Sequence, residues 1–171
     1  TKYLSEIIAS FHKAYPLVTF EIYSGNESNV KDYIERGLLD IGLMLDAVDI
    51  CKYEFVSMPV KERWGVLVCK DSELAHKEQI CPEDLKNIPL IMSAGEFPLG
   101  SYAQSVEIAA RGNLLYNEAM LAASNIGVVI CIQLNCTYDG LRFIPLFPAM
   151  ETETVLAWKK NQTMSHAADA L

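Results

Sequence analysis

Small polar residues stand at three places where an apolar, strand-like run gives way to a helical pattern. Asn26 and Ser28 belong to YSGNES, residues 23–28, which leads into the apolar positions of a helix. Ser93 ends the apolar run PLIMS, and Asn113 precedes a later helix that it can equally cap. Helix N-termini offer unpaired N–H groups and partial positive charge, so these residue types predict contacts to a small, preferably anionic, ligand.

Each of these residues also has a purely structural explanation. Asn26 and Ser28 can cap the next helix, which explains them about as well as a ligand does, and both roles can coexist. Taken alone, Ser93 is more typical of a strand-end turn residue than of a ligand contact. It becomes a stronger candidate for a contact only if it faces Asn26 across a cleft. Glu96 and Phe97, in the following loop, are candidates for a pocket wall, although a surface loop is the commoner place for the acid.

Hydrophobic periodicity indicates the elements that position these residues. A helical pattern follows Thr1, and then Val18, Phe20 and Ile22 alternate with polar residues as in a half-buried strand. A helix capped by Asn26 or Ser28 ends at Gly37, and residues 40–45 follow, which are nearly all apolar. We therefore predict a βαβ unit with parallel strands over residues 17–45.

A second α/β group follows two strands that are predicted close together, at residues 54–60 and 64–69. Its predicted elements are a short helix at 81–85, a strand at 89–93, a helix near 101–110 with a possible short strand at 106–109, a helix at 114–123 and a buried strand at 126–132. The tail adds strands at 141–146 and 154–158 and a helix after Ser165.

The tail cannot form a core alone, so we expect it to return to the first group. This predicts lobe I from residues 1–63 plus 145–171 and lobe II from residues 66–140, with two crossing segments as a hinge. Because ligands bind beyond the carboxyl ends of strands in open parallel sheets, the three polar loops are expected to line one cleft between facing lobes.

Charge and cysteine usage narrow the class of protein. The chain has 22 acidic and 14 basic residues, a net charge of −8, which disfavours nucleic-acid binding by this piece alone. Its longest apolar runs are too short to span a bilayer, and no signal peptide is visible, so we expect a soluble chain without a membrane partner. Five cysteines without close pairing fit a reducing cytoplasm, and the absence of a starting methionine suggests a fragment of a longer protein.

The sequence offers little support for catalysis, for a metal or for a cofactor. No G-x-S-x-G elbow and no phosphate-binding G-x-x-x-x-G-K loop occur, and no histidine has a second histidine or a cysteine at helical spacing. Cys131 falls in an apolar strand pattern, which predicts an unreactive thiol in the core. A redox-active pair of Cys131 and Cys136 is a minor alternative.

Several segments, in order and spacing, resemble the effector-binding domain of LysR-type transcriptional regulators over nearly the whole chain. They are FHKAYPLVTFEIYSGNESNVKDYIERGLLDIGLML, ERWGVLVCKDSELAHKEQICPEDLKNIPLI, ASNIGVVI followed by DGLRFIPLFP, and SHAADAL. The resemblance implies an α/β, periplasmic-binding-protein-like (type 2) fold of two Rossmann-like lobes joined by two crossing strands. It also implies a small-molecule effector between the lobes, a homodimer or homotetramer, and DNA contact only through an N-terminal domain that this chain lacks.

Carried onto this sequence, the resemblance makes Asn26, Ser93 and Asn113 ligand contacts and Thr1 the remnant of a first loop whose strand would precede it. The ligand-binding residues predicted in all are Thr1, Asn26, Ser28, Ser93, Glu96, Phe97 and Asn113. The chain departs from the family in having fewer residues after SYAQ and ASNIG where a G-x-G is usual. The competing hypothesis is a free-standing solute-binding protein of a transporter, which the same fold would serve.

Overall fold

The computed structural model describes residues 2–45, 49–93, 106–134 and 136–171, and it divides into two compact units. Unit 1 comprises Thr1–Lys61 and Glu153–Leu171, and unit 2 comprises Glu62–Thr152. The chain passes from one unit to the other inside two strands, β2 (Tyr53–Cys69) and β7 (Glu151–Lys159).

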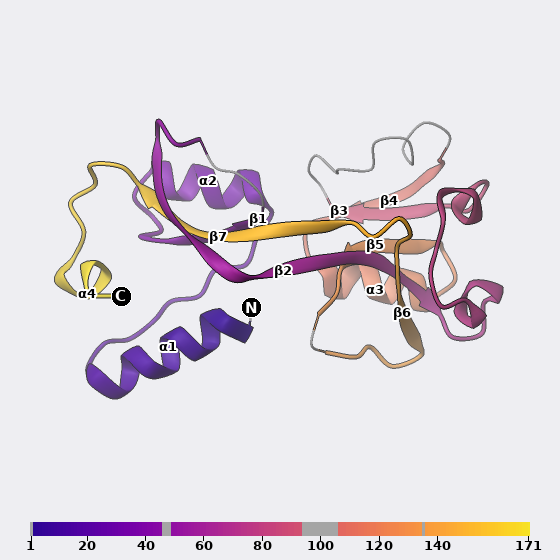
Figure 1. The fold of residues 1–171 in the computed structure, drawn as a ribbon, viewed down its shortest axis with the longest axis horizontal. Helices are drawn as coiled ribbons and strands as arrows, with labels where there is room; N and C mark the ends of the chain where they lie inside the picture. Colours follow the sequence, from indigo (N-terminus) through magenta and orange to yellow (C-terminus); the bar gives the residue numbers. More distant parts are fainter. Residues whose placement is uncertain (1, 46–48, 94–105, 135) are drawn as a thin grey trace. The chain divides into compact units, whose positions relative to one another are not determined.

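Unit 1 packs one short helix against a pair of antiparallel strands. Strand β1 (Gly42–Leu45) pairs with β7, and helix α2 (Glu27–Glu35) lies beside them (Figure 1). The apolar positions of α2 that the sequence pattern marks, Val30 and Ile34, are buried against Met44 and Val155. Gly37 has a φ of +68° where the chain leaves the helix, as its left-handed role predicts.

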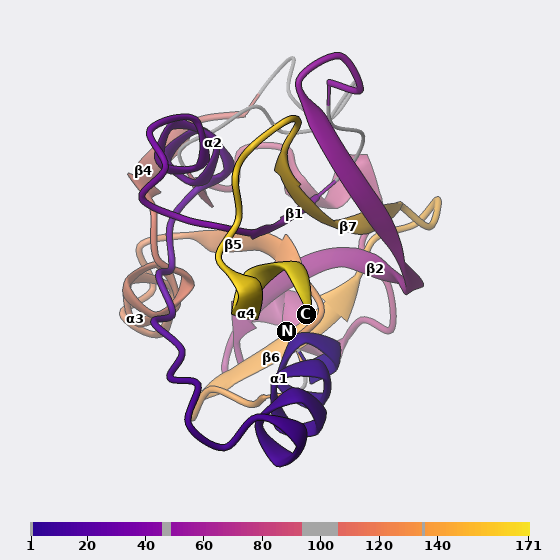
Figure 2. The same cartoon turned by 90° about the vertical axis from the view of Figure 1, so that its left-hand side faces the viewer.

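Two further helices complete unit 1. Helix α1 (Lys2–Ala14) and α2 lie on opposite sides of the β1–β7 pair, as Figures 1 and 2 show. The short helix α4 (His166–Asp169) near the C terminus is capped by Ser165, whose hydroxyl accepts the N–H of Ala168. The helices predicted at the start of the chain and after Ser165 are therefore confirmed.

The predicted strand at Val18–Tyr23 is wrong, and so is the parallel βαβ unit over residues 17–45. The residues between α1 and α2 form no strand; Val18 and Phe20 are half-buried, but Ile22 is exposed. A strand requires a neighbouring backbone to satisfy its N–H and C=O groups, and no described strand lies in register with this segment. The other strand of the predicted unit, β1, runs antiparallel to β7.

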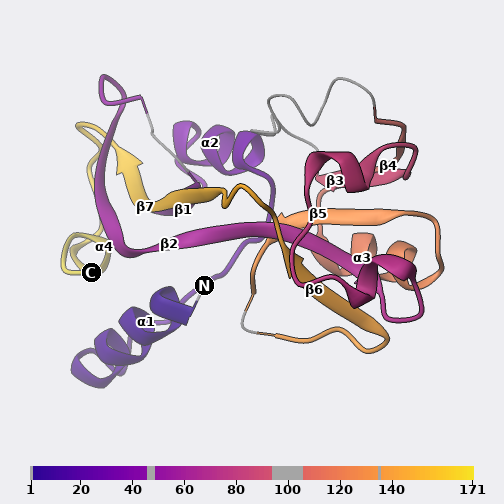
Figure 3. The same ribbon diagram turned by 45° about the vertical axis from the view of Figure 1, so that its right-hand side comes forward.

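Unit 2 is a sheet in which β2 is flanked by β5 (Val128–Ile132) and β6 (Leu141–Pro145), both antiparallel to it. Beyond β5, two parallel neighbours follow, β3 (Leu90–Ser93) and then β4 (Ile108–Gly112). Helix α3 (Leu115–Ala123) lies beside β5 (Figure 3). Two one-turn 3-10 helices, Glu73–His76 and Pro82–Leu85, connect β2 to β3.

The core of unit 2 forms where α3 covers the sheet. Ala119 and Ala122 of α3 are fully buried and pack in one cluster with Ile91, Val129 and Leu141 from three strands. Small residues on the helix face let its backbone approach the β-branched and leucine side chains of the sheet closely. The apolar strands predicted at residues 89–93, 126–132 and 141–146 are thus confirmed, each within two residues of its predicted bounds.

Two other predictions in unit 2 need correction. The strands expected at 54–60 and 64–69 are one continuous strand, β2, because the polar residues between them stay extended where the chain changes unit. The helix expected near 101–110 is wrong for residues 108–110, which belong to β4, whereas residues 101–105 lie outside the described part. The alternative short strand at 106–109 is close to the observed β4.

Candidate functional site

Asn26 caps helix α2 in unit 1 with its side chain. Its Oδ1 accepts the backbone N–H of Asn29 at 2.9 Å and the hydroxyl of Ser28 at 2.8 Å. Capping is therefore the observed role of Asn26, and Ser28 donates its hydroxyl to the same cap oxygen. The backbone N–H groups of Glu27 and Ser28, in the first turn, have no partner four residues back within the helix. They give this end of α2 the donors and the partial positive charge that favour an anion.

The residues before Asn26 explain the composition of YSGNES. The ring of Tyr23 stacks on Tyr33 of α2 with 4.7 Å between centroids. A Cβ at position 25 would lie only 2.8 Å from Cε1 of Tyr23, so glycine is the residue that lets the backbone pass beside this ring. The missing side chain at Gly25 therefore lets the chain enter α2 while Tyr23 packs on Tyr33.

The first turn of α2 also carries an ion pair. Lys31 Nζ pairs with the carboxylate of Glu27, one turn earlier. Pairing reduces the repulsion that the Glu27 carboxylate would exert on an anion at the start of the helix, because the two charges oppose each other at close range.

In unit 2, Ser93 and Gly112 end two neighbouring parallel strands. They are register partners at the carboxyl ends of β3 and β4. Ser93 is exposed, and its Oγ donates to the carboxylate of Glu118 on α3, 3.2 Å from Oε1 and 3.3 Å from Oε2. The carboxyl edge of parallel strands is where ligands bind in open α/β sheets, so Ser93 is suitably placed within its unit.

Asn113 and Arg111 flank the end of β4. Both are exposed. Asn113 does not cap α3, because Leu114 occupies the cap position and makes no side-chain hydrogen bond there. The prediction that Asn113 can cap this helix is wrong, so capping does not explain why Asn113 stands at this position.

Glu118 is the residue of this region that sequence reasoning missed. It is only 1% exposed, and the loss of hydration on burial raises the pKa of its carboxyl, while the hydrogen bond from Ser93 opposes that rise. A signal was present in the sequence, since Glu118 follows Leu115 by three residues and precedes Ala122 by four. That spacing places an acid on the apolar face of the helix.

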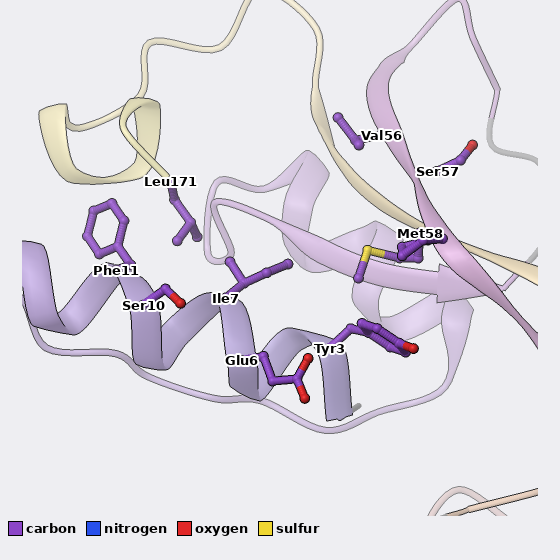
Figure 4. A pocket seen from close by; sticks show the side chains of 10 residues that line it. Tyr3, Glu6, Ile7, Ser10, Phe11, Val56, Ser57, Met58 and Leu171 are labelled. Carbon is purple, nitrogen blue, oxygen red and sulfur yellow. The ribbon is translucent and has the colours of Figure 1, made fainter.

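A separate hollow in unit 1 lies between α1, β2 and the C terminus. It has a volume of about 590 Å³, and Figure 4 shows Ile7 and Phe11 of α1 facing Leu171, with Met58 of β2 nearby. None of the described residues predicted to bind ligand lines it. Its wall is mostly apolar and includes the carboxylate of Glu6, so it is poorly suited to hold an anion.

The structure shows no further cluster suited to metal or thiol chemistry among the residues it describes. Among the described residues, no group of three His, Cys, Asp or Glu side chains could hold a metal ion. Burial raises the pKa of the Cys131 thiol to about 12, so it carries almost no thiolate near neutral pH. In the described ranges no helix has both the length and the apolar character needed to cross a bilayer.

The comparisons with known proteins now decide the family. A family model described as LysR substrate binding domain matches residues 1–171. The chain belongs to this LysR family. The family is non-enzymatic, so the prediction that the chain is no enzyme is confirmed.

One relative of the LysR chain by sequence is YfeR of Shigella flexneri, described as an uncharacterized HTH-type transcriptional regulator. It is 24% identical over 182 residues, which cover 98% of this chain and 58% of YfeR. The chain thus spans little more than half the length of this relative.

Two solved structures share the fold. The effector-binding domain of QuiR in complex with shikimate has a TM-score of 0.84 at 17% identity, covering 98% of this chain and 85% of that one. The regulatory domain of CcmR from Synechocystis PCC6803 in complex with 2-PG has a TM-score of 0.81 at 12% identity, covering 99% and 87%. LysR effector-binding domains have periplasmic-binding-protein type 2 folds, so the predicted α/β fold class is confirmed.

The predicted ligand contacts of the LysR chain stay predictions. Asn26 and Ser28 lie together at the start of α2 in unit 1, and Ser93 and Asn113 lie at the ends of adjacent strands in unit 2. The other three predicted contacts, Thr1, Glu96 and Phe97, lie outside the described residues.

Proposed function

We propose that this chain senses a small organic anion for a LysR-type transcriptional regulator. The observation that carries the proposal is the family match over the whole chain, joined to a polar helix start in unit 1. The first turn of α2 presents the N–H groups of Glu27 and Ser28, and Asn26 holds that turn in place. The ligand contacts proposed are Asn26, Ser28, Ser93 and Asn113, with Thr1, Glu96 and Phe97.

The class of ligand follows from the donors in these contacts and from what related domains bind. QuiR binds shikimate and CcmR binds 2-PG, according to the descriptions of their structures. Backbone N–H groups at a helix start favour a carboxylate or a phosphate, and Arg111 at the end of β4 adds an exposed cation in unit 2. A small organic acid is therefore the ligand class that we propose.

The regulatory step that we propose is a population shift. An effector that binds one arrangement of the two lobes better than another stabilises that arrangement by its difference in binding free energy. In the parent regulator this difference would bias a homodimer or homotetramer and so its contact with DNA, which is made by a separate N-terminal domain. The proposed location is the cytoplasm.

A thermal-shift screen of small organic acids, shikimate among them, tests this function on the 171-residue chain. A ligand at about a hundred times its Kd stabilises the folded state by about 2.7 kcal/mol. For a chain of this size that free energy corresponds to a rise in Tm of about 5 to 10 °C. No rise with any acid in the panel would contradict the proposal.

Site variants then localise the binding. Asn26→Ala and Ser93→Ala should each remove most of the ligand-induced rise in Tm, measured against the Tm of the same variant without ligand. Ser124→Ala is the matched control, because Ser124 is an exposed serine whose hydroxyl bonds to the carbonyl of Met120 away from these residues. If both site variants keep the full rise, the assigned residues are not the ligand contacts.

Two other functions are less well supported. A free-standing solute-binding protein would share the fold, but the LysR family match covers residues 1–171. A thiol redox sensor built on Cys131 and Cys136 needs a reactive thiolate, whereas burial raises the pKa of the Cys131 thiol to about 12.

A further inference from the structure

A buried carboxylate lies directly behind an exposed candidate contact in unit 2. Glu118 is 1% exposed, whereas its hydrogen-bond donor Ser93 is open to solvent. The hydroxyl oxygen is 3.2 Å and 3.3 Å from the two carboxylate oxygens, so one proton is shared between both. Ser93 therefore stands between a buried acid and whatever approaches the carboxyl ends of β3 and β4.

The backbone of β4 holds this carboxylate in position. A Cβ at Gly112 would lie 2.7 Å from both Cγ and Oε1 of Glu118, closer than real Cβ contacts occur. A side chain at position 112 would therefore displace the Glu118 side chain from the end of the strand. Because Gly112 is the register partner of Ser93, the same contact places the carboxylate against the end of β3.

Among the residues that the structure describes, a thiol and a phenol are the titratable groups whose pKa values Glu118 affects. Burial raises the pKa of the Cys131 thiol on β5 and of the Tyr138 phenol after it, and the negative charge of Glu118 adds to both shifts. Both groups are neutral near pH 7 and bring no positive charge to the carboxylate. The hydrogen bond from Ser93 is thus an important source of stabilisation for the ionised form of Glu118.

The number of protons and lone pairs on a hydroxyl determines whether the exposed side of Ser93 can donate or accept a hydrogen bond. An ionised carboxylate only accepts hydrogen bonds, and a serine hydroxyl has one proton and two lone pairs. With that proton directed at Glu118, the exposed side of Ser93 Oγ presents lone pairs alone. A second anionic acceptor approaching Ser93 would find no proton and would be repelled by Glu118.

We propose that Glu118 is a positioning residue that makes Ser93 a hydrogen-bond acceptor, so that the effector presents a hydroxyl or N–H donor there. The proposal rests on the proposed function and narrows its ligand class from organic acids in general to hydroxy or amino acids. The acidic group of such a ligand binds away from Ser93. Carboxylic acids that carry no hydroxyl or N–H group cannot donate a hydrogen bond to Ser93, so we expect them to bind more weakly.

The first test needs no ligand and follows the Glu118 carboxyl carbon by NMR in a pH titration. Its signal is assigned by its loss in Glu118→Gln. We expect a higher pKa for Glu118 in Ser93→Ala than in the wild-type chain, and an unchanged pKa in Ser124→Ala. An unchanged Glu118 pKa in Ser93→Ala would overturn the proposal, because it would show that Ser93 does not donate to the carboxylate.

The second test compares ligands that differ in one proton donor. Calorimetry measures the affinity of glycolate against fluoroacetate and of shikimate against its monofluoro analogues, in which fluorine replaces a hydroxyl of similar size. We expect at least one replacement to weaken binding to the wild-type chain by about tenfold or more, as sites that bond a substrate hydroxyl discriminate strongly. The same replacement should cost less than about twofold in Ser93→Ala, which has no hydroxyl to accept the bond. It should also cost less in Glu118→Gln than in the wild-type chain, because the glutamine amide can donate to Ser93 as well as accept from it and no longer fixes the hydroxyl proton.

The outcomes separate this proposal from the proposed function. Binding of both members of every pair with equal affinity to the wild-type chain supports the function and overturns the role of Glu118. If the chain binds no acid, the proposed function is contradicted. If the pKa of Glu118 nevertheless depends on Ser93, the hydrogen bond from Ser93 to Glu118 is supported.

Discussion

Replacing Ser93 by alanine measures how far the buried Glu118 carboxylate depends on one hydroxyl. A hydrogen bond to a charged group contributes about 1.5 to 3 kcal/mol to stability. The distances of 3.2 Å and 3.3 Å are long for a hydroxyl bonded to a carboxylate, which places this bond near the lower limit. We therefore expect Ser93→Ala to lower the free energy of unfolding by about 1.5 kcal/mol when Glu118 is ionised.

The loss should depend on pH in a defined direction. Burial raises the pKa of Glu118 above its ordinary 4.5, so the folded chain binds the proton more tightly than the unfolded chain. Stability contributed by the neutral acid is therefore present at low pH and is lost as the pH rises above that ordinary value. Ser93→Ala raises the pKa further, so the free energy that it costs grows with pH. Near pH 4 the substitution removes a neutral hydrogen bond and costs about 0.5 to 1 kcal/mol, against about 1.5 kcal/mol when Glu118 is ionised.

Calorimetric melting at about pH 4 and pH 8 is the assay. For a chain of this size 1.5 kcal/mol corresponds to about 3 to 6 °C in Tm, and the loss at the lower pH should be about half of that. In the Glu118→Gln background Ser93→Ala should cost the same at both pH values, since glutamine does not titrate. Equal losses at both pH values in the wild-type background, or a pH dependence that survives Glu118→Gln, would refute the reasoning.

Three other perturbations probe the fold and the thiols. Asn26→Ala should cost about 1 kcal/mol through loss of the α2 cap, and Asn26→Ser should restore most of it in urea unfolding, whereas no difference between the two would refute the cap. Ile34→Ala should cost about 2 to 5 kcal/mol in the same assay because Ile34 is fully buried against β1 and β7, and a loss below about 1 kcal/mol would contradict that packing. Iodoacetamide near neutral pH should alkylate exposed Cys51 and Cys136 and spare Cys131, as mass spectrometry of the folded chain would show, and rapid labelling of Cys131 would contradict its burial.

Local patterns in the sequence predicted local structure well. The cap at Asn26, the left-handed Gly37 and the helix after Ser165 each depend on residues within one helical turn, and each is observed. The apolar strands of unit 2 were also predictable, since runs such as 126–132 are too apolar and β-branched to be exposed.

Pairing between distant segments was not predictable in the same way. The alternation of Val18, Phe20 and Ile22 reports a period of two, but it carries no information about whether a neighbouring backbone is available. Strand β1 pairs with β7, which lies more than a hundred residues further along the chain, so a local reading favoured a parallel βαβ unit in its place.

The sequence predicted which polar residues belong to the candidate site, but it predicted their structural roles only in part. Asn26 and Ser93 were found because small polar residues at strand ends are visible in the sequence. Glu118 was missed because an acid within a helical pattern is usually solvated, and its burial depends on Gly112 and Ser93, which lie on two strands.

Amide chemical shifts during titration with an organic acid test the central claim most directly. On addition of shikimate to the isotopically labelled chain, we expect the N–H signals of Glu27 and Ser28 to move, together with those of Ser93 and Gly112. Saturable shifts confined to the apolar hollow lined by Ile7, Phe11 and Leu171 would contradict the account.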